Sequence, residues 1–149
     1  DTLLSSRDTL LSSRDTLLSS RAQSRDLFLF EPGKALMKAG FFDLISDHFG
    51  VHKMGVSTHY YVTDDKSKLE DLEKFGKVYN IISIQPLDKR TIKAAGKEYP
   101  HSEVTARNIP MDTETLRKKL GVTSGDDAHI FGLKSDSLGN LLIIGKRLV

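Results

Sequence analysis

The sequence predicts an α/β or α+β domain in which helices pack on a mixed β-sheet, preceded by an N-terminal helix built from heptad repeats. Three observations favour this class. Residues 77–110 alternate between strand-like and helix-like patterns, residues 111–149 add one more helix and two apolar strands, and the first 21 residues are a seven-residue repeat. At 149 residues the chain is long enough for one self-supporting domain and an appendage.

The appendage consists of DTLLSSR written three times without substitution. Its paired leucines recur every seven residues, so they line one face of a helix, and the aspartate that opens each repeat suits a helix cap. Three explanations fit repeats that are identical to one another. The segment docks on the domain, it self-associates through residues 1–21, or it is an artefact of expression. We place the domain boundary after a polar linker: residues 1–26 form the repeat helix and linker, and residues 27–149 form the folded domain.

The first part of the folded domain predicts a helix, a strand and a second helix. After the apolar run 27–30, a helix begins at Pro32, since proline is tolerated in the first turn, and ends at Gly50. Residues 59–63 suit a strand. The charged run 64–76 predicts a short exposed helix with Leu69 and Leu72 on its inner face and Gly76 at its end.

The second part decides the fold class. Residues 77–87 predict a strand, residues 87–98 a helix and residues 102–110 a strand, which we interpret as a β-α-β unit. Asp112 or Thr113 is then in position to cap a helix that ends at Gly121. Strands at 129–135 and 141–149 follow, joined through residues 135–140, and the order of the strands in the sheet stays open.

The composition excludes several functional classes. The chain has no cysteine, so a disulfide-rich scaffold, a thiolate zinc site and a cysteine nucleophile are excluded, and a reducing, cytoplasmic setting is expected. No apolar run approaches the ~20 residues of a membrane span, so no membrane partner is expected. The sequence has no phosphate loop, nucleophile elbow or glycine-rich dinucleotide motif, and its histidines lack metal-ligand spacing. We therefore expect neither catalytic residues nor metal ligands.

The charge distribution is more informative than the net charge of +2. Residues 26–76 carry 6 basic and 9 acidic side chains, whereas residues 77–119 carry 9 basic and 5 acidic ones, so the middle of the chain is a basic block. If its elements share a face, the block suits about six to nine phosphate contacts and a salt-dependent hold on RNA, with Tyr79 and Tyr99 as stacking surfaces. Ordinary solvated helix faces are the alternative explanation.

Several short motifs resemble one protein family. EPGKALMKAG at 31–40, FFDLISDHFGVHKM at 41–54 and STHYYVTDD at 57–65 resemble the start of the THUMP-like domain found at the C-terminal end of a group of bacterial class I S-adenosylmethionine-dependent methyltransferases. VTARNIPMDTETLRKKLGV at 104–122 and GDDAHIFGL at 125–133 resemble the second half of that domain. The resemblance covers about residues 27–149 in order. Gly33 departs from it, because asparagine is usual at that position.

The resemblance implies a THUMP-like fold and an accessory domain that binds RNA and positions it for a methyltransferase. The catalytic core and its S-adenosylmethionine site lie outside this chain, which has no cofactor of its own. The expected partners are structured RNA, either tRNA or ribosomal RNA, and the methyltransferase catalytic domain; a structural lid or dimerisation module without nucleic-acid contact is the alternative. Charge and predicted geometry, rather than the family, place the RNA contacts at Lys89, Arg90, Lys93, Arg107, Asn108, Lys118 and Lys119.

Overall fold

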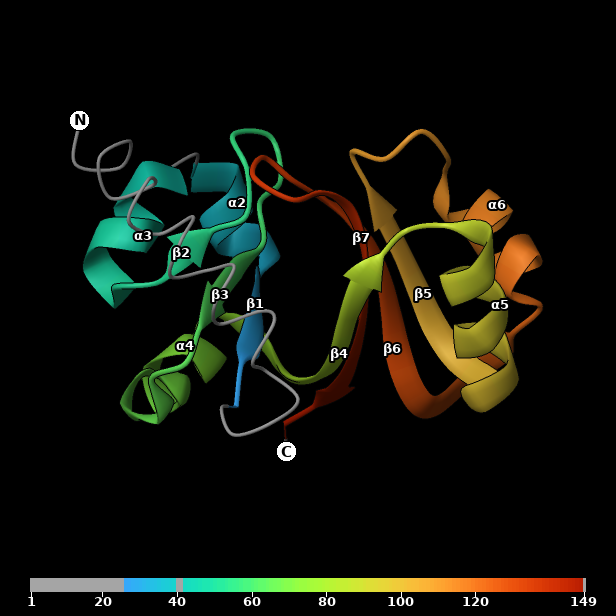
Figure 1. The fold of residues 1–149 in the computed structure, drawn as a ribbon. Helices are drawn as coiled ribbons and strands as arrows, with labels where there is room; N and C mark the ends of the chain where they lie inside the picture. The colour runs from blue at the N-terminus through green and yellow to red at the C-terminus, as the bar shows by residue number, and fades with distance from the viewer. Residues whose placement is uncertain (1–25, 40–41, 149) are drawn as a thin grey trace.

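A seven-stranded mixed sheet with helices packed on it forms the domain, which confirms the predicted fold class (Figure 1). The computed structural model describes residues 26–39 and 42–148, so the predicted repeat helix lies outside the described residues. The strand order is β2-β3-β1-β4-β7-β6-β5. The elements are β1 (Phe28–Pro32), α2 (Lys34–Ala39), α3 (Phe42–Phe49), β2 (His52–Lys53), β3 (Tyr61–Thr63), η1 (Lys66–Lys68), α4 (Leu69–Glu73), β4 (Gly76–Pro86), α5 (Lys89–Glu98), β5 (His101–Arg107), α6 (Thr113–Leu120), β6 (Thr123–Ser135) and β7 (Gly139–Arg147).

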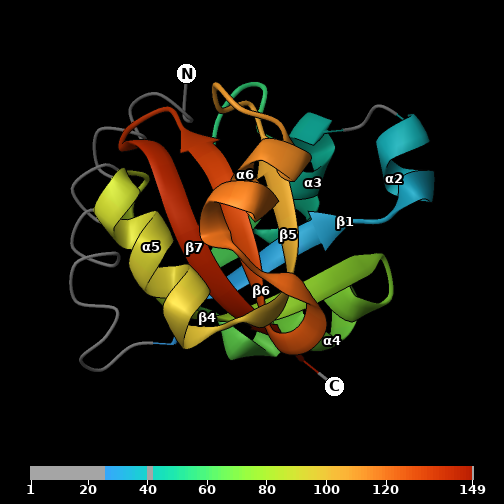
Figure 2. The same cartoon turned by 90° about the vertical axis from the view of Figure 1, so that its right-hand side faces the viewer.

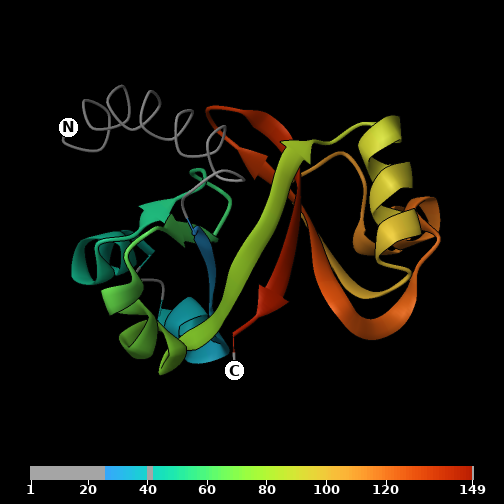
Figure 3. The ribbon, with the colours of Figure 1, turned by 60° about the horizontal axis from the view of Figure 1, so that its bottom comes forward.

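Strand β4 joins two halves of this sheet. Residues 76–80 of β4 pair with β1, and residues 79–86 pair with β7. The register with β7 shifts between Ile81 and Ser83, so Ile82 is an extra residue, and a bulge of this kind bends its strand and increases the local twist. The sheet therefore bends into two halves, β2-β3-β1 and β7-β6-β5, with β4 running from one to the other (Figure 3).

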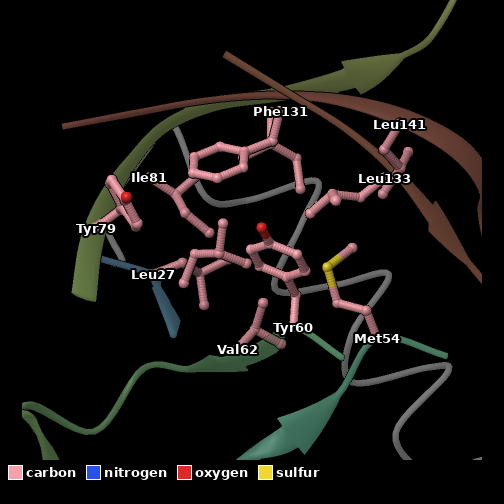
Figure 4. Packing of buried hydrophobic residues seen from close by; sticks show 11 residues of the cluster. Leu27, Met54, Tyr60, Val62, Tyr79, Ile81, Phe131, Leu133 and Leu141 are labelled. Atoms are coloured by element: carbon pink, nitrogen blue, oxygen red, sulfur yellow. The ribbon is translucent and has the colours of Figure 1, made fainter. Parts of the chain in front are cut away.

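The inner faces of the two halves meet in an apolar core (Figure 4). The rings of Tyr79 on β4 and Phe131 on β6 lie 4.9 Å apart between centroids, and Leu29 reaches the same core from β1. Fully burying one such large side chain stabilises the fold by about 1.5–3 kcal/mol. The inner core contains Leu27, Leu29, Met54, Tyr60, Val62, Tyr79, Ile81, Phe131, Leu133, Leu141 and Ile143.

Helices cover the outer face of each half. Phe49 on α3 and Leu72 on α4 pack against outward residues of β1, β3 and β4, which confirms the predicted inner face of the 64–76 helix. Ile92 on α5 and Leu116 on α6 pack against outward residues of β5, β6 and β7. Figure 2 shows α5 and α6 in front of this second half. Within the described residues, no helix is long and apolar enough to cross a membrane.

The segment between β2 and β3 is hydrogen-bonded to the opposite half of the sheet. Asn108, which follows β5, donates from its side-chain amide to the carbonyl oxygen of Ser57 and, over 3.3 Å, to the hydroxyl of Thr58. Asp136, between β6 and β7, accepts from the backbone N–H of Val56 over 2.9 Å. Asn108 has a φ of 60°, a left-handed conformation that asparagine adopts more readily than most residues. These bonds join residues that the bend in β4 brings together.

The structure corrects the prediction that a helix begins at Pro32. Residues 28–32 form a strand that is paired on both sides, with β3 and with β4, and a continuous apolar run is typical of a strand buried on both faces. Two helices, α2 and α3, lie within the range of the single predicted helix. Gly76 does not end a helix, because α4 ends at Glu73 and Gly76 begins β4, where a Cβ atom would lie only 2.1 Å from the Glu31 carbonyl oxygen.

The prediction of a β-α-β unit over residues 77–110 is wrong about which strands are neighbours. Strands β4 and β5 run in the same direction, but β7 and β6 lie between them. The adjacent parallel pair is β5 with β6, and α6 connects it. Strand β6 begins at Thr123 instead of residue 129 and pairs along the whole of β5.

The predicted ends of α6 are confirmed. Asp112 is the N-cap, and its carboxylate accepts from the backbone N–H of Thr115 over 2.8 Å. The hydroxyl of Thr113 accepts instead from the backbone N–H of Ala106, which attaches the helix to β5. Gly121 ends the helix with a φ of 71°, a left-handed conformation that suits glycine.

The contact between α5 and α6 predicts that Gly96→Ala destabilises the domain. An alanine at an exposed helical position is usually about 1 kcal/mol more favourable than glycine. At position 96, however, a Cβ atom would lie 1.9 Å from the carbonyl oxygen of Leu120, so the two helices must separate. We expect a net loss of about 1–3 kcal/mol in the free energy of unfolding, measured by urea denaturation. An increase in stability would contradict the close approach.

Candidate functional site

The inner face of the bent sheet is apolar at one end and polar at the other. In β1, Leu27 and Leu29 lie in the inner core, and the alternation of side chains along a strand puts Glu31 on the same face. In β5, Val104 and Ala106 face the outer core, so the residues between and beside them point inward. The same alternation puts these polar residues on the inner face: Glu31, Lys77, Glu103, Thr105, Arg107, His129 and Arg147.

One hollow at this polar end lies beside Glu31, and we call it the Glu31 hollow. It has a volume of about 600 Å³, and Lys34, Lys77 and Arg107 are among its lining residues. The hydroxyl of Tyr60 donates to Oε2 of Glu31 over 2.6 Å. Because the Tyr60 ring is buried in the inner core, this hydrogen bond holds the carboxylate at the wall of the hollow.

A second hollow of about 680 Å³ lies beside His129 and shares Lys77 with the first. The His129 ring stacks on Phe131 with centroids 4.1 Å apart and an interplanar angle of 8°. Its Nε2 atom lies 2.8 Å from the hydroxyl of Thr105. Glu103, on the wall of this hollow, accepts from the hydroxyl of Ser124 and from a backbone N–H. We call the two hollows together the polar cleft.

Positive charge predominates in the polar cleft. Five cationic and three acidic residues line it, all five cationic residues are exposed, and the alternation along β7 puts the side chain of one of them, Lys146, on the outer face. The ion pairs formed among the described residues, such as Arg117 with Glu114, involve none of these five cations. The cations are Lys34, Lys77, Arg107, Lys146 and Arg147, and the acids are Glu31, Glu103 and Asp126.

Burial fixes the protonation of the uncharged groups in the cleft. Burial, with a smaller contribution from the Glu31 carboxylate, raises the pKa of Tyr79 to about 12. Burial and the hydrogen bond to Glu31 also raise the pKa of Tyr60. Burial lowers the pKa of His129 to about 4, although Glu31 and Glu103 act in the opposite direction. At neutral pH the phenols are protonated and His129 is neutral, so the positive charge comes from lysine and arginine.

The structure separates the residues that the sequence assigned to RNA contact. Arg107 and Asn108 line the Glu31 hollow, although the Asn108 amide is bonded to Ser57 and Thr58. The other five lie on the helix layer that covers the outer face of β5, β6 and β7. The expectation that the basic block converges on one surface is therefore wrong, because α5 and α6 lie across the sheet from the end of β5. The residues on that layer are Lys89, Arg90 and Lys93 on α5 and Lys118 and Lys119 on α6.

Sequence reasoning missed most residues of the polar cleft. Glu31 and Lys77 are 46 positions apart, yet they are register partners on β1 and β4. Arg147 pairs in turn with Tyr79 of β4. A signal for Glu31 was present, because it continues the two-residue alternation of Leu27 and Leu29. The pairing of β1 with β4 is not visible in the sequence, so nothing pointed to the cleft as a whole.

The polar cleft does not fit S-adenosylmethionine. The sulfonium group of that cofactor is positively charged and would face an excess of lysine and arginine. The rings of Tyr60 and Tyr79 belong to the inner core and provide no exposed platform for adenine. Among the described residues there is also no group of three histidine, aspartate or glutamate side chains placed to hold a metal ion.

The lowered pKa of His129 predicts a stability change on mild acidification. Between about pH 6.5 and pH 4 the unfolded chain binds a proton on this residue that the folded chain does not, so stability falls as the pH falls. From pH 7 to pH 5 we expect this residue to account for a loss of about 1–2 kcal/mol. His129→Gln should lose correspondingly less stability over this interval, measured by urea denaturation. Equal losses in the two proteins would show that His129 titrates normally.

Comparisons with known proteins agree with this architecture. Residues 28–69 match the family model of a ferredoxin-like domain, and residues 76–147 match that of a THUMP-like domain. No curated protein matches the chain. The fold is similar to the crystal structure of a putative methyltransferase from Porphyromonas gingivalis W83, with a TM-score of 0.73 and 23% sequence identity over 85% of this chain.

The match to that protein is partial, because this chain spans 31% of its length. At 23% identity the likeness shows a shared fold. The start of β4 marks the division between the two family matches, since the ferredoxin-like match ends before β4 and the other match begins with it. Residues 76–147 are thus similar to a THUMP-like domain.

Proposed function

We propose that this chain is the accessory RNA-binding domain of an S-adenosylmethionine-dependent methyltransferase and that it holds structured RNA in the polar cleft. The excess of exposed cations in the cleft is the observation that carries this proposal. The THUMP-like match and the similarity in fold to a putative methyltransferase support it. The cofactor belongs to the catalytic domain of such an enzyme, and the chain acts in the cytoplasm on tRNA or ribosomal RNA.

Phosphate binding in the cleft follows from the arrangement of its cations. Lys77 lies where the two hollows meet, Arg107 ends β5, and Arg147 ends β7, so the positive charges follow the cleft and are not concentrated at one point. A backbone of regularly spaced phosphates suits such a row. Contacts of this kind position RNA and do not identify its bases.

The outer surface formed by Lys89, Arg90, Lys93, Lys118 and Lys119 is the second candidate for RNA contact. Among the described ion pairs, none involves these five residues. The close approach of Gly96 to Leu120 places the last turn of α6 beside the second half of α5, whereas Lys89 and Arg90 begin α5. Lys89 lies seven positions before Gly96, about 10 Å along the axis, so the cations at the start of α5 lie away from those in the last turn of α6.

Charge reversal distinguishes the two surfaces. We expect Lys77→Glu with Arg107→Glu to weaken binding of a labelled tRNA at least about tenfold, because two cations are replaced by anions. Lys89→Glu with Lys93→Glu makes the same change of charge on α5 and should weaken binding much less. Both variants should keep the wild-type thermal stability, since exposed charges contribute little to it.

Other outcomes of this comparison are also informative. A larger loss from the α5 variant would move the RNA contact to the outer surface. Absence of tRNA and ribosomal RNA binding by the wild-type chain would favour a structural lid or dimerisation module, as would loss of folding in the cleft variant. Dimer formation by the wild-type chain, measured by light scattering, would then support the dimerisation alternative.

The salt dependence of binding tests the number of phosphate contacts. If the four cleft cations other than Lys146 each contact one phosphate, the slope of log K against log salt concentration should be about −2.8 to −3.6. Titrations of labelled tRNA at several salt concentrations measure this slope. A slope shallower than about −2 is incompatible with a four-cation contact.

A further inference from the structure

The negative charge of the Glu31 carboxylate is unfavourable in a site that binds a polyanion. It lies in the same hollow as Lys34, Lys77 and Arg107, where it repels any phosphate that these cations attract. An ionised carboxylate only accepts hydrogen bonds. If RNA occupies the cleft as proposed above, Glu31 is therefore suited to meet a hydrogen-bond donor of the RNA and not a phosphate.

The carboxylate is held in position by a buried neighbour. Tyr60, which is 4% exposed, donates its hydroxyl to Oε2 over 2.6 Å. Lys77 is the register partner of Glu31 on the adjacent strand, yet the ion pairs of the described residues do not include this one. Both charges consequently remain available to a ligand, and the Tyr60 hydroxyl holds Oε2 of the carboxylate.

The surroundings of Glu31 favour a sugar hydroxyl over a base as the donor. Proteins that recognise unpaired RNA bases stack them on exposed aromatic rings while bonding their edges. The two tyrosines beside Glu31 cannot serve this purpose, because Tyr60 is 4% and Tyr79 is 3% exposed. The ribose 2′-hydroxyl needs no stacking platform, and it lies next to the phosphates that Lys77 and Arg107 would bind.

We infer that Glu31 accepts a hydrogen bond from a ribose 2′-hydroxyl in the polar cleft, with Tyr60 as its positioning residue, and that this contact makes the cleft select RNA over DNA. The inference rests on the proposed function. The cations bind phosphates of either nucleic acid, so they supply affinity without this selectivity. The carboxylate supplies the selectivity, because a DNA strand offers no donor at that point and leaves the charge facing phosphates.

The test compares one tRNA sequence prepared with ribose, with 2′-deoxyribose and with 2′-fluororibose, bound to the full chain. The fluoro form keeps the ribose-like sugar conformation but lacks the donor. We expect the wild-type chain to bind the ribose form about tenfold more tightly than either of the others, the effect of one hydrogen bond to a charged acceptor. Equal affinity for the ribose and fluoro forms would overturn the inference.

Glu31→Gln should bring the three affinities within about twofold of one another. The quantity to compare is the ratio of the affinities for the ribose, deoxy and fluoro forms, because removing one negative charge raises the affinity for all three. Glu103→Gln is the matched control: it removes the same charge from the cleft, but this carboxylate is already bonded to Ser124 and Gly125. It should keep the wild-type ratio, and loss of the ratio in both variants would also overturn the inference.

Tyr60→Phe tests the positioning role. It keeps the ring in the inner core and removes the hydroxyl that holds Glu31, so selectivity should fall while affinity for the deoxy form stays unchanged. An unchanged ratio would reject this role for Tyr60. Failure of the wild-type chain to bind the ribose form at all would instead reject the proposed function, whereas binding without selectivity would reject this inference alone.

Discussion

The apolar contact between the two inner faces of the bent sheet is the constraint on which the rest of the structure depends. A single sheet with helices on its outer sides exposes its inner face unless it folds over or acquires another layer. Here the sheet folds over, and β4, which carries the bulge at Ile82, pairs with β1 along residues 76–80 and with β7 along residues 79–86. The face that becomes buried contains some of the largest apolar side chains of the domain, including Tyr79 and Phe131.

The polar cleft is a consequence of the same bend. Strands β1, β4, β6 and β7 each continue from the inner core to a polar residue on the same face, so charges from several strands meet where the core ends. Tyr60 links the two regions, since its ring packs in the core and its hydroxyl is bonded to Glu31. Affinity for phosphate and selectivity for ribose would then depend on one packed interior.

The two outer faces have a different character. Helices α5 and α6 cover one half with apolar side chains such as Ile92 and Leu116, and they approach each other at Gly96 and Leu120. Their exposed sides carry lysine and arginine in ordinary solvated positions. These cations make up most of the basic block at residues 77–119, which is why charge alone pointed to them. The cations of the cleft are fewer, but the fold places them around a hollow.

Local patterns in the sequence determined the elements that depend on neighbouring residues: the Asp112 cap, the left-handed end at Gly121, and the strands and helices from residue 77 onward. Caps and periodicity act over a few residues, so they are visible without a partner. Only the tertiary structure decided that β1 is a central strand, that β5 pairs with β6 and not with β4, and that Glu31 lies across from Lys77. These pairings join residues far apart in the chain, and their stability comes from the apolar surface that the bent sheet buries, which no short segment displays.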